Sequence, residues 1–432
     1  MKRVLIFALM VFWATGISGQ IHLEKYNFGE GLQFTGDSGY KMQLDGYIQP
    51  YLETRKFSNS DDLYNRFRMR RFRVRLSGTS ENEKFKYRLQ VDLSGSTEAD
   101  VDESGNTMLL DGFVSYDIDD HYTVTFGQKA TPTDNLELGM SSQTLQLPER
   151  SRVTSVFSSI REFGLFIDAS YKIRGTDVHI KPSLAITNGD GMNVFKKDRG
   201  GLKYGGRINV LPLGLFRNFG QFRQGDMMRE LTPKLLIGFT YSYNNGISDR
   251  RGRETGSILY LDADGNEALP DYEKFGIDML FKYKGFSLLG EYVKANAHVG
   301  DDITQRVRTD GSVTPDFAIN GIQDVGNYIK NRMMLGSGFN LQAGYIFKNL
   351  WSVDARYTHL KADQYSYLNN AAFYARPNYY TVGITKYLGK NYGAKIQLAG
   401  TYVDADPTAT DNDGILINGH EWIGTLVFTV GF

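Results

Sequence analysis

The residues with the clearest chemical potential are six arginines that fall within ten consecutive positions. They are Arg66, Arg68, Arg70, Arg71, Arg73 and Arg75. A guanidinium group keeps its positive charge at physiological pH and offers a planar fork of donors that matches carboxylate and phosphate. Alternate side chains of a strand share one face, so this run predicts a row of fixed cations suited to binding small anions. Alternation with apolar residues slips by one position between Arg70 and Arg71, which predicts either a β-bulge or the top of the strand.

Charge balance is a second interpretation of the same row. The acidic residues Asp45, Glu53 and Asp92 lie on segments that we expect to neighbour it. If the arginines pair with these carboxylates, they neutralise charge within the protein. If they face water in a narrow pore instead, stacked cations favour the passage of anions over cations. The sequence leaves both interpretations open.

The stretch 130–162 combines charged and apolar residues without a strand pattern. Its charged residues include Glu149, Arg150, Arg152 and Arg161. Its apolar residues, suited to packing against a wall, include Met140, Leu145, Leu147 and Phe157. We therefore expect a loop that folds inward and constricts a pore, with an ordinary surface loop as the alternative.

Other chemistry finds little support in the sequence. The chain has no cysteine, which excludes disulfides, thiolate metal sites and cysteine nucleophiles. Its six histidines are scattered, and the sequence contains no zinc-protease, serine-hydrolase or Walker motif. Carboxylates at Asp262, Asp264 and Glu273 are spaced as in a calcium loop, but Glu267 occupies the position that needs glycine, so we interpret them as a solvated turn. We expect no enzyme activity, no metal and no cofactor.

The elements that position these residues follow a period of two. Sixteen segments of about ten residues alternate apolar and polar side chains, the length that a tilted strand needs to cross a bilayer. They span roughly 41–53, 66–78, 85–93, 109–118, 121–129, 163–172, 177–188, 203–212, 234–243, 273–284, 286–294, 336–347, 350–361, 378–389, 392–403 and 420–432.

Short and long connections alternate between these segments. This layout, with an even number of strands, is typical of an outer-membrane β-barrel. Only a closed sheet satisfies every backbone polar group inside hydrocarbon, which explains apolar side chains outside and polar ones inside. One connection, 213–233, is long where a short turn is expected, and a misplaced strand there would change the count to fourteen or eighteen.

The chain begins with Lys2, Arg3 and an apolar run, followed by small residues, which predicts a cleaved signal peptide over 1–19. We expect a periplasmic lead-in over 20–40 and an all-β transmembrane barrel over 41–432. Lysine plus arginine and aspartate plus glutamate balance at 49 each, so no global field favours nucleic acid.

Several stretches resemble the phosphate-selective porin family, in a version like those of Bacteroidetes. They include RFRMRRFRVRLSG from residue 66, FKYRLQVDL from residue 85, VTFGQKATPTD from residue 124, LPERSRVTSVFSSIREFG ending at residue 164, and AITNGDG from residue 185. The resemblance implies a sixteen-stranded homotrimer in the bacterial outer membrane, with a third loop that narrows the lumen and inward arginines that conduct anions.

From these observations we expect a passive porin embedded in outer-membrane lipid. Arg66 to Arg75 would guide small anions such as phosphate past the loop at 130–162. The alternative is a structural or accessory barrel of an outer-membrane protein complex, with a plugged or non-selective lumen.

Overall fold

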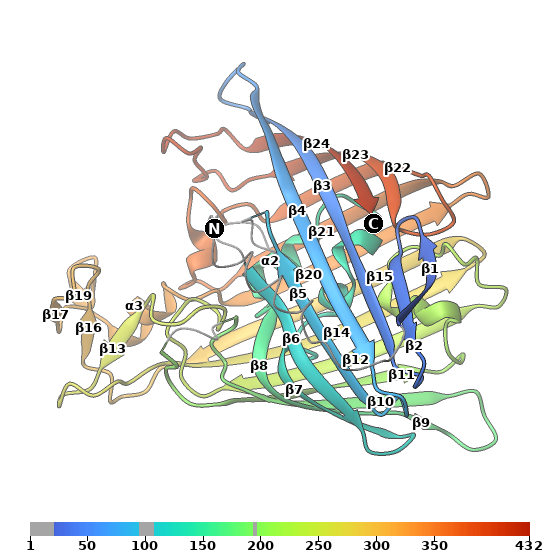
Figure 1. The fold of residues 1–432 in the computed structure, drawn as a ribbon. Helices are drawn as coiled ribbons and strands as arrows, with labels where there is room; N and C mark the ends of the chain where they lie inside the picture. Colours follow the sequence, from blue (N-terminus) through green and yellow to red (C-terminus); the bar gives the residue numbers. More distant parts are fainter. Residues whose placement is uncertain (1–20, 95–107, 193–196) are drawn as a thin grey trace, which may run out of the picture.

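The computed structural model describes residues 21–94, 108–192 and 197–432, and it forms a closed antiparallel barrel (Figure 1). The predicted signal peptide at 1–19 lies outside the described residues. The sixteen predicted strands are confirmed. They are β3 (Lys41–Phe57), β4 (Tyr64–Thr79), β5 (Phe85–Asp92), β6 (Met108–Asp117), β7 (Tyr122–Ala130), β8 (Arg161–Ala169), β10 (His179–Thr187), β11 (Lys203–Leu211), β12 (Lys234–Asn244), β14 (Asp271–Tyr283), β15 (Phe286–His298), β20 (Gly336–Ile346), β21 (Trp351–Ala362), β22 (Asn378–Tyr387), β23 (Ala394–Asp404) and β24 (His420–Gly431).

Each of these strands pairs with its neighbours in chain order, and β24 pairs with β3 to close the barrel. The two-residue strand β9 (Tyr171–Lys172) continues β8 along β10. Closure leaves no free edge among the sixteen strands, which is the condition for a sheet that crosses lipid. Among the described residues, no helix combines the length and apolarity that a membrane crossing requires.

The alternation along each strand separates the two faces of the wall. Outward residues such as Leu184, Val382 and Leu398 are 58–65% exposed, although they are apolar. Inward residues beside them, such as Thr381 and Gln397, are buried by material inside the barrel. On the outer face, the rings of Tyr357, Tyr380, Tyr402 and Trp422 follow one another across β21 to β24 with centroids 5.0–6.2 Å apart. Such an aromatic row is typical of a membrane interface.

The predicted slip in the arginine row is a β-bulge in β4. Gln49 of β3 pairs with Arg71, and the next residue, Pro50, pairs with Met69, so Arg70 is the extra residue. Proline has no N–H for the ladder, which suits it to an irregular position. Arg70 and Arg71 therefore both point into the barrel.

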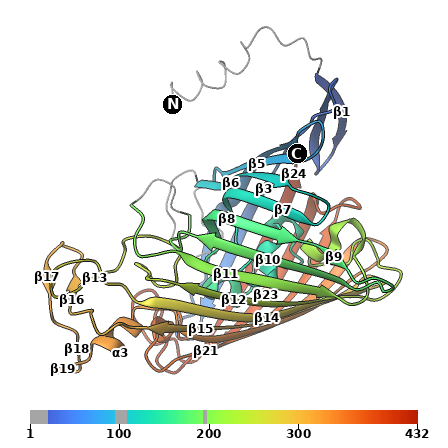
Figure 2. The ribbon, with the colours of Figure 1, turned by 90° about the horizontal axis from the view of Figure 1, so that it is seen from below.

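Two additions extend the barrel. A hairpin of β1 (Ile21–Asn27) and β2 (Gly31–Gly36) pairs with the beginning of β3 and projects from one end of the barrel (Figure 2). The carbonyl of Phe28 in its turn accepts a hydrogen bond from Asn391, between β22 and β23, at 3.0 Å. The sequence pattern predicted no strands in this lead-in. At the opposite end, a lobe contains β13 (Leu259–Leu261), β16 (Gln305–Val307), β17 (Val313–Thr314), β18 (Ala318–Ile319), β19 (Ile322–Gln323) and α3 (Val325–Lys330).

Candidate functional site

Residues 131–160, between β7 and β8, lie inside the barrel. They contain the short helices η2 (Leu136–Gly139), η3 (Ser142–Thr144) and α2 (Arg152–Phe157). Leu145, Leu147, Val153 and Phe157 are each no more than 1% exposed. Burial of these apolar side chains against the wall is favourable, which explains why the segment turns inward rather than projecting into water. We call it the inner loop.

Inward-facing glycines on the wall make room for the inner loop. A Cβ at Gly338 would lie 2.9 Å from side-chain carbons of Val153 and Phe157. A Cβ at Gly383 would lie 2.5 Å from Leu147. Larger residues at Gly338 and Gly383 would displace the inner loop. Its position therefore depends on glycine at these two places in the wall.

Wall side chains bind the backbone of the inner loop. The Lys395 ammonium donates to the carbonyl of Leu145, and Gln397 donates to the carbonyl of Gln146 at 2.7 Å. Thr385 donates to the same Gln146 carbonyl at 3.0 Å. These bonds satisfy loop carbonyls that would otherwise be buried without partners.

Buried charges also fix the loop. Asp134 receives a hydrogen bond from Lys274 of β14, and Glu137 accepts from the backbone N–H of Ser151 at 2.8 Å. Burial alone would raise the pKa of Asp134, but the charges of Lys274 and Lys203 outweigh it and hold that pKa below its ordinary value. Asp134 therefore anchors the inner loop as an ionised carboxylate.

A second segment enters the barrel from the end with the short turns. This is the long connection 212–233, which contains η4 (Arg217–Phe222). The Lys282 ammonium binds its carbonyls at Gly220, Arg223 and Gly225 at 2.8–2.9 Å. The unusual length of this connection was visible in the sequence and suited the alternative of an accessory barrel, but its position inside the lumen was not predicted.

The two inward segments meet. Gln224 accepts a hydrogen bond from the backbone N–H of Gln146 at 2.9 Å and donates to Glu137 at 2.7 Å. Gln224, Gln146 and Glu137 are each at most 2% exposed. The connection and the inner loop thus form one hydrogen-bonded body within the lumen.

The structure divides the predicted arginine row by depth. Arg70, Arg71 and Arg73 are at most 2% exposed. Arg70 and Arg71 bind Glu149 of the inner loop, and their nearest nitrogens lie 2.6 and 2.9 Å from its oxygens. These contacts place the middle of the row inside an ionic network.

The next two arginines pair with acids on neighbouring strands. Arg73 pairs with Asp92 at 2.8 Å, and Arg75 pairs with Asp45 at 2.7 Å. Charge balance, one of the two interpretations of the sequence, therefore describes this part of the row.

Arg66 and Arg68, at the other end, line a cavity of about 690 Å³. The Arg68 guanidinium lies 4.9 Å from the ring centroid of Tyr51 and 4.0 Å from a carboxylate oxygen of Glu53. We call this cavity the vestibule.

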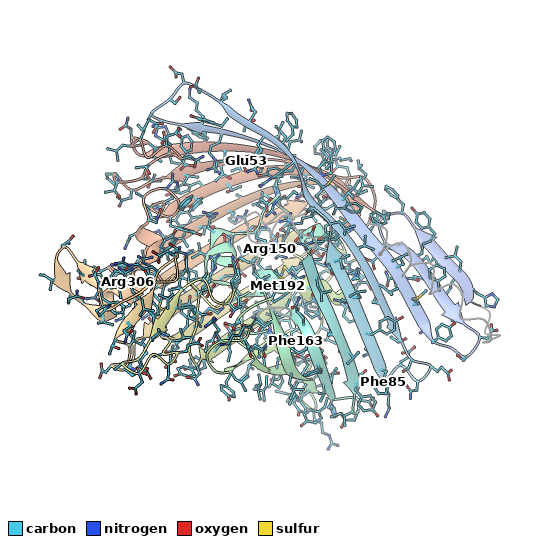
Figure 3. All side chains as sticks on the ribbon, turned by 60° about the vertical axis from the view of Figure 1, so that its left-hand side comes forward. Glu53, Phe85, Arg150, Phe163, Met192 and Arg306 are labelled. Atoms are coloured by element: carbon cyan, nitrogen blue, oxygen red, sulfur yellow. The ribbon has the colours of Figure 1, made fainter. Side chains whose placement is uncertain are left out.

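The predicted loop arginines have different positions. Arg150, labelled in Figure 3, lies within the barrel. It is buried and donates to the carbonyls of Glu137 and Met140 of its own loop. Arg152 lies 5.4 Å from the ring centroid of Tyr379 and borders the vestibule. Arg161, which was predicted to belong to the loop, is the first residue of β8 and pairs with Asp111 of β6 at 2.8 Å.

The wall of the vestibule is predominantly cationic. Counted over the described part of the chain, it includes seven arginines and three glutamates. The arginines are Arg55, Arg66, Arg68, Arg150, Arg152, Arg356 and Arg376, and the glutamates are Glu53, Glu149 and Glu421.

Sequence reasoning missed Arg55, Arg356 and Arg376 because none of them belongs to a run. Arg356 could have been identified from the alternation of β21, because it lies on the same inward face as Asp354 and Thr358. Arg376 precedes β22 and pairs with Glu421, which is distant in the sequence. No local sequence pattern therefore indicates this pairing.

Of the residues considered as a cation loop, Asp262 and Asp264 lie in an ordinary turn and Glu273 lies in β14. Asp262 accepts hydrogen bonds from the backbone N–H groups of Asp264 and Asn266 at 2.9 and 2.8 Å. Within residues 21–94, 108–192 and 197–432, no group of three or more histidine and carboxylate side chains could hold a metal ion.

Solved structures with this fold include several outer-membrane channels. An anion-selective porin from Comamonas acidovorans aligns with a TM-score of 0.51 at 11% identity, over 91% of this chain and 100% of that one. The outer-membrane channel DcaP of Acinetobacter baumannii aligns with a TM-score of 0.51 at 12% identity, over 92% and 99%. OprB of Pseudomonas putida aligns with a TM-score of 0.52 at 11% identity, over 92% of this chain and 95% of that one. At these identities the likeness shows the fold.

No curated protein matches the sequence significantly. A family match, however, covers residues 44–313, more than half of the 432 residues, and its description is phosphate-selective porin O and P. Together with the closed barrel of sixteen strands, this match shows that the chain belongs to the phosphate-selective porin O and P family, as an outer-membrane porin.

Proposed function

We propose that this porin passes small anions, phosphate among them, through the arginine-lined vestibule. The observation that carries the proposal is the charge of the vestibule wall, where seven arginines and three glutamates lie among the described lining residues. Fixed guanidinium groups lower the energy of an anion in a narrow aqueous space and raise that of a cation. Arginine also keeps its charge when partly buried, which suits it to this position.

The glutamates of the vestibule support this direction of selectivity. Glu421 is bound by Arg376, and Arg55 lies 3.8 Å from its other oxygen. Glu53 lies 3.4 Å from Arg55. Because each carboxylate is close to an arginine, an entering cation has to compete with a fixed positive charge.

Recording from single channels in planar bilayers tests the proposal. We expect discrete conductance steps and, in a potassium chloride gradient, a reversal potential of the sign set by chloride. A preference for potassium would refute the anion selectivity and leave the porin assignment intact. Selectivity for phosphate over chloride is measured in the same way, with phosphate replacing chloride on one side.

A second candidate function is a structural barrel with a plugged lumen. The meeting of the inner loop with the 212–233 connection at Gln224 and Gln146 favours it, because these segments enter from opposite ends. A plugged barrel predicts no steps in the unmodified protein and new steps when Gln224→Ala removes the side chain that bonds the backbone N–H of Gln146 and the carboxylate of Glu137. A porin predicts steps before any change.

We also propose that the protein is a homotrimer and that residues 1–19 are removed on export. Both expectations rest on the resemblance and on the sequence. Native mass spectrometry in detergent tests the first. N-terminal sequencing of protein purified from outer membranes tests the second.

A further inference from the structure

A buried carboxylate at the end of the barrel that carries the long connections has an oxygen without a hydrogen-bond donor. Asp190 lies between β10 and β11, is 0% exposed, and accepts a hydrogen bond at Oδ2 from the backbone N–H of Arg199 at 2.9 Å. Among the described residues, its Oδ1 has no partner. Buried polar atoms normally have one, so this oxygen is suited to a bound ligand or a water molecule. Met192, labelled in Figure 3, marks this part of the connection.

The charge of Asp190 is also unbalanced. Other buried acids of the lumen, such as Asp134 and Glu162, each pair with a lysine. Among the groups of the described chain that act most strongly on the charge of Asp190, none is a basic side chain. An ionised carboxylate buried without an opposite charge is unfavourable, so the site lacks a positive partner.

A second carboxylate faces Asp190. The side chain of Asp198, from the same connection, comes within hydrogen-bonding reach, and burial together with this neighbour raises the pKa of Asp190 to about 7. Thr255, from the connection between β12 and β13, lies beside Asp190 and donates a hydrogen bond to the carbonyl of Lys197 at 2.9 Å. Two carboxylates at such close range require either a shared proton or a cation between them.

A neutral oxygen nearby also has no hydrogen-bond partner in the described part of the chain. Asn244, the last residue of β12, is 2% exposed and donates from Nδ2 to the carbonyl of Gly189 at 2.7 Å. Its Oδ1 has no donor and lies beside Gly189, the residue before Asp190. Carboxylate, amide, hydroxyl and main-chain oxygens therefore meet in one place. Oxygen ligands select hard cations, and calcium tolerates the irregular geometry that loops provide better than magnesium does.

We propose that Asp190 and Asp198 bind a calcium ion, with neutral oxygens of Thr255, Lys197 and Asn244 beside them and water completing its coordination. The inference goes beyond the proposed function and does not depend on which ions pass. Because the site has two carboxylates rather than three or four, we expect a dissociation constant of about 0.1–1 mM, the range of extracellular calcium modules. The cation neutralises both carboxylates and gives Asp190 Oδ1 a partner.

The proposed ion joins two connections at the mouth of the barrel, because Asp190 and Thr255 belong to different ones. Arg253, from the same connection as Thr255, donates to the carbonyls of Ser158 and Ser155 of the inner loop at 2.6 and 3.0 Å. The site is thus linked to the segment that narrows the lumen. We therefore expect calcium to stabilise the mouth against unfolding.

Isothermal titration calorimetry with calcium chloride tests the proposal on the purified protein in detergent, after a chelator has removed divalent cations. The variants are Asp190→Asn and Asp198→Asn, and the control is Asp264→Asn, which removes an exposed carboxylate from a turn. At about pH 8, where the carboxylates are ionised, we expect about one ion per unmodified chain. Affinity should be about tenfold weaker in Asp190→Asn and in Asp198→Asn, and unchanged in Asp264→Asn.

Thermal unfolding provides a second measurement if Asp190→Asn folds poorly. Calcium at about 10 mM should raise the unfolding temperature of the unmodified protein and of Asp264→Asn more than magnesium at the same concentration does. This difference should disappear in Asp198→Asn, which changes an exposed side chain. Folding of each variant is checked by the heat-dependent shift of its band in gel electrophoresis.

Two results would overturn the inference. One is the absence of calcium binding and of calcium-dependent stabilisation in the unmodified protein, which would leave a shared proton or a water molecule as the partner of Asp190. The other is equal binding in Asp198→Asn and the unmodified protein, or a loss confined to Asp264→Asn, which would place the ion elsewhere. Failure of the proposed function gives a different result, namely cation preference in bilayer recordings.

Discussion

Neutralising three vestibule arginines should abolish most of the anion preference. Arg55→Gln, Arg66→Gln and Arg68→Gln together remove three positive charges from the part of the vestibule formed by β3 and β4. Among the residues that the structure describes, the wall carries seven arginines and three glutamates, so the net charge of this described lining falls from four positive to one. Glutamine keeps much of the side-chain volume, so the change acts mainly on charge.

The size of the effect follows from the dimensions of the vestibule. A sphere of about 690 Å³ has a radius of roughly 5–6 Å, which places an ion at its centre about 8 Å from the wall charges. Each charge then contributes roughly 0.5 kcal/mol in water, which screening at about 0.15 M salt reduces to roughly 0.2 kcal/mol. Four charges make the energy of an anion in the vestibule about 1.5 kcal/mol lower than that of a cation, which corresponds to roughly a tenfold ratio of permeabilities. One charge gives a ratio of about twofold.

The assay is the reversal potential in a potassium chloride gradient, measured at two salt concentrations. At about 0.01 M salt the screening length grows to about 30 Å, so the preference of the unmodified protein should rise above about a hundredfold. Lys41→Gln, which removes a charge outside the vestibule, is the control. The electrostatic reasoning is refuted if the triple variant keeps its preference or if Lys41→Gln loses as much.

Three further predictions concern the inner loop and the wall. Gly383→Leu should push Leu147 aside at a cost of about 1–3 kcal/mol, seen as new protease cleavage within the loop, and unchanged protection would contradict this. Val382→Arg, on the lipid face at mid-strand, should lower the free energy of unfolding in lipid vesicles by about 2–4 kcal/mol, whereas Val382→Leu should not. Because the pKa of Glu149 is lowered from 4.5 to about 2, its stabilisation is complete above about pH 4.5 and is lost as pH falls through about 2. The difference in free energy of unfolding between the unmodified protein and Glu149→Gln should therefore stay constant from about pH 8 to pH 5, and a decline within that range would be inconsistent with the pairing.

Most of the wall could be predicted from the sequence because the bilayer imposes a strict rule on it. Each strand has lipid on one face and a polar interior on the other, so a period of two identifies it locally. The same rule located the bulge, because an extra residue in the strand is what brings the adjacent side chains of Arg70 and Arg71 to one face. The hairpin β1 and β2 escaped prediction because it lies outside the barrel, where no such rule applies.

The interior could be predicted only in part, because its contacts join distant segments. The arginine row was visible as a run, but its pairing with Glu149 spans 79 residues. The contact between Gln224 and Gln146 spans 78 residues and depends on how two loops fill one space. Arg376 and Glu421 likewise meet only through the fold. Local pattern identifies the charges, whereas complementarity between remote segments determines their partners.

The lysine and glutamine bonds to the carbonyls of the inner segments have a consequence for how such proteins diversify. The hydrogen bonds go to main-chain carbonyl oxygens, which every residue type carries, and they are donated by Lys282, Lys395 and Gln397. Recognition of this kind is indifferent to the side chains displayed toward the solute. Evolution or an engineer can therefore rewrite those side chains for a new cargo while the scaffold that holds the segments in place stays the same.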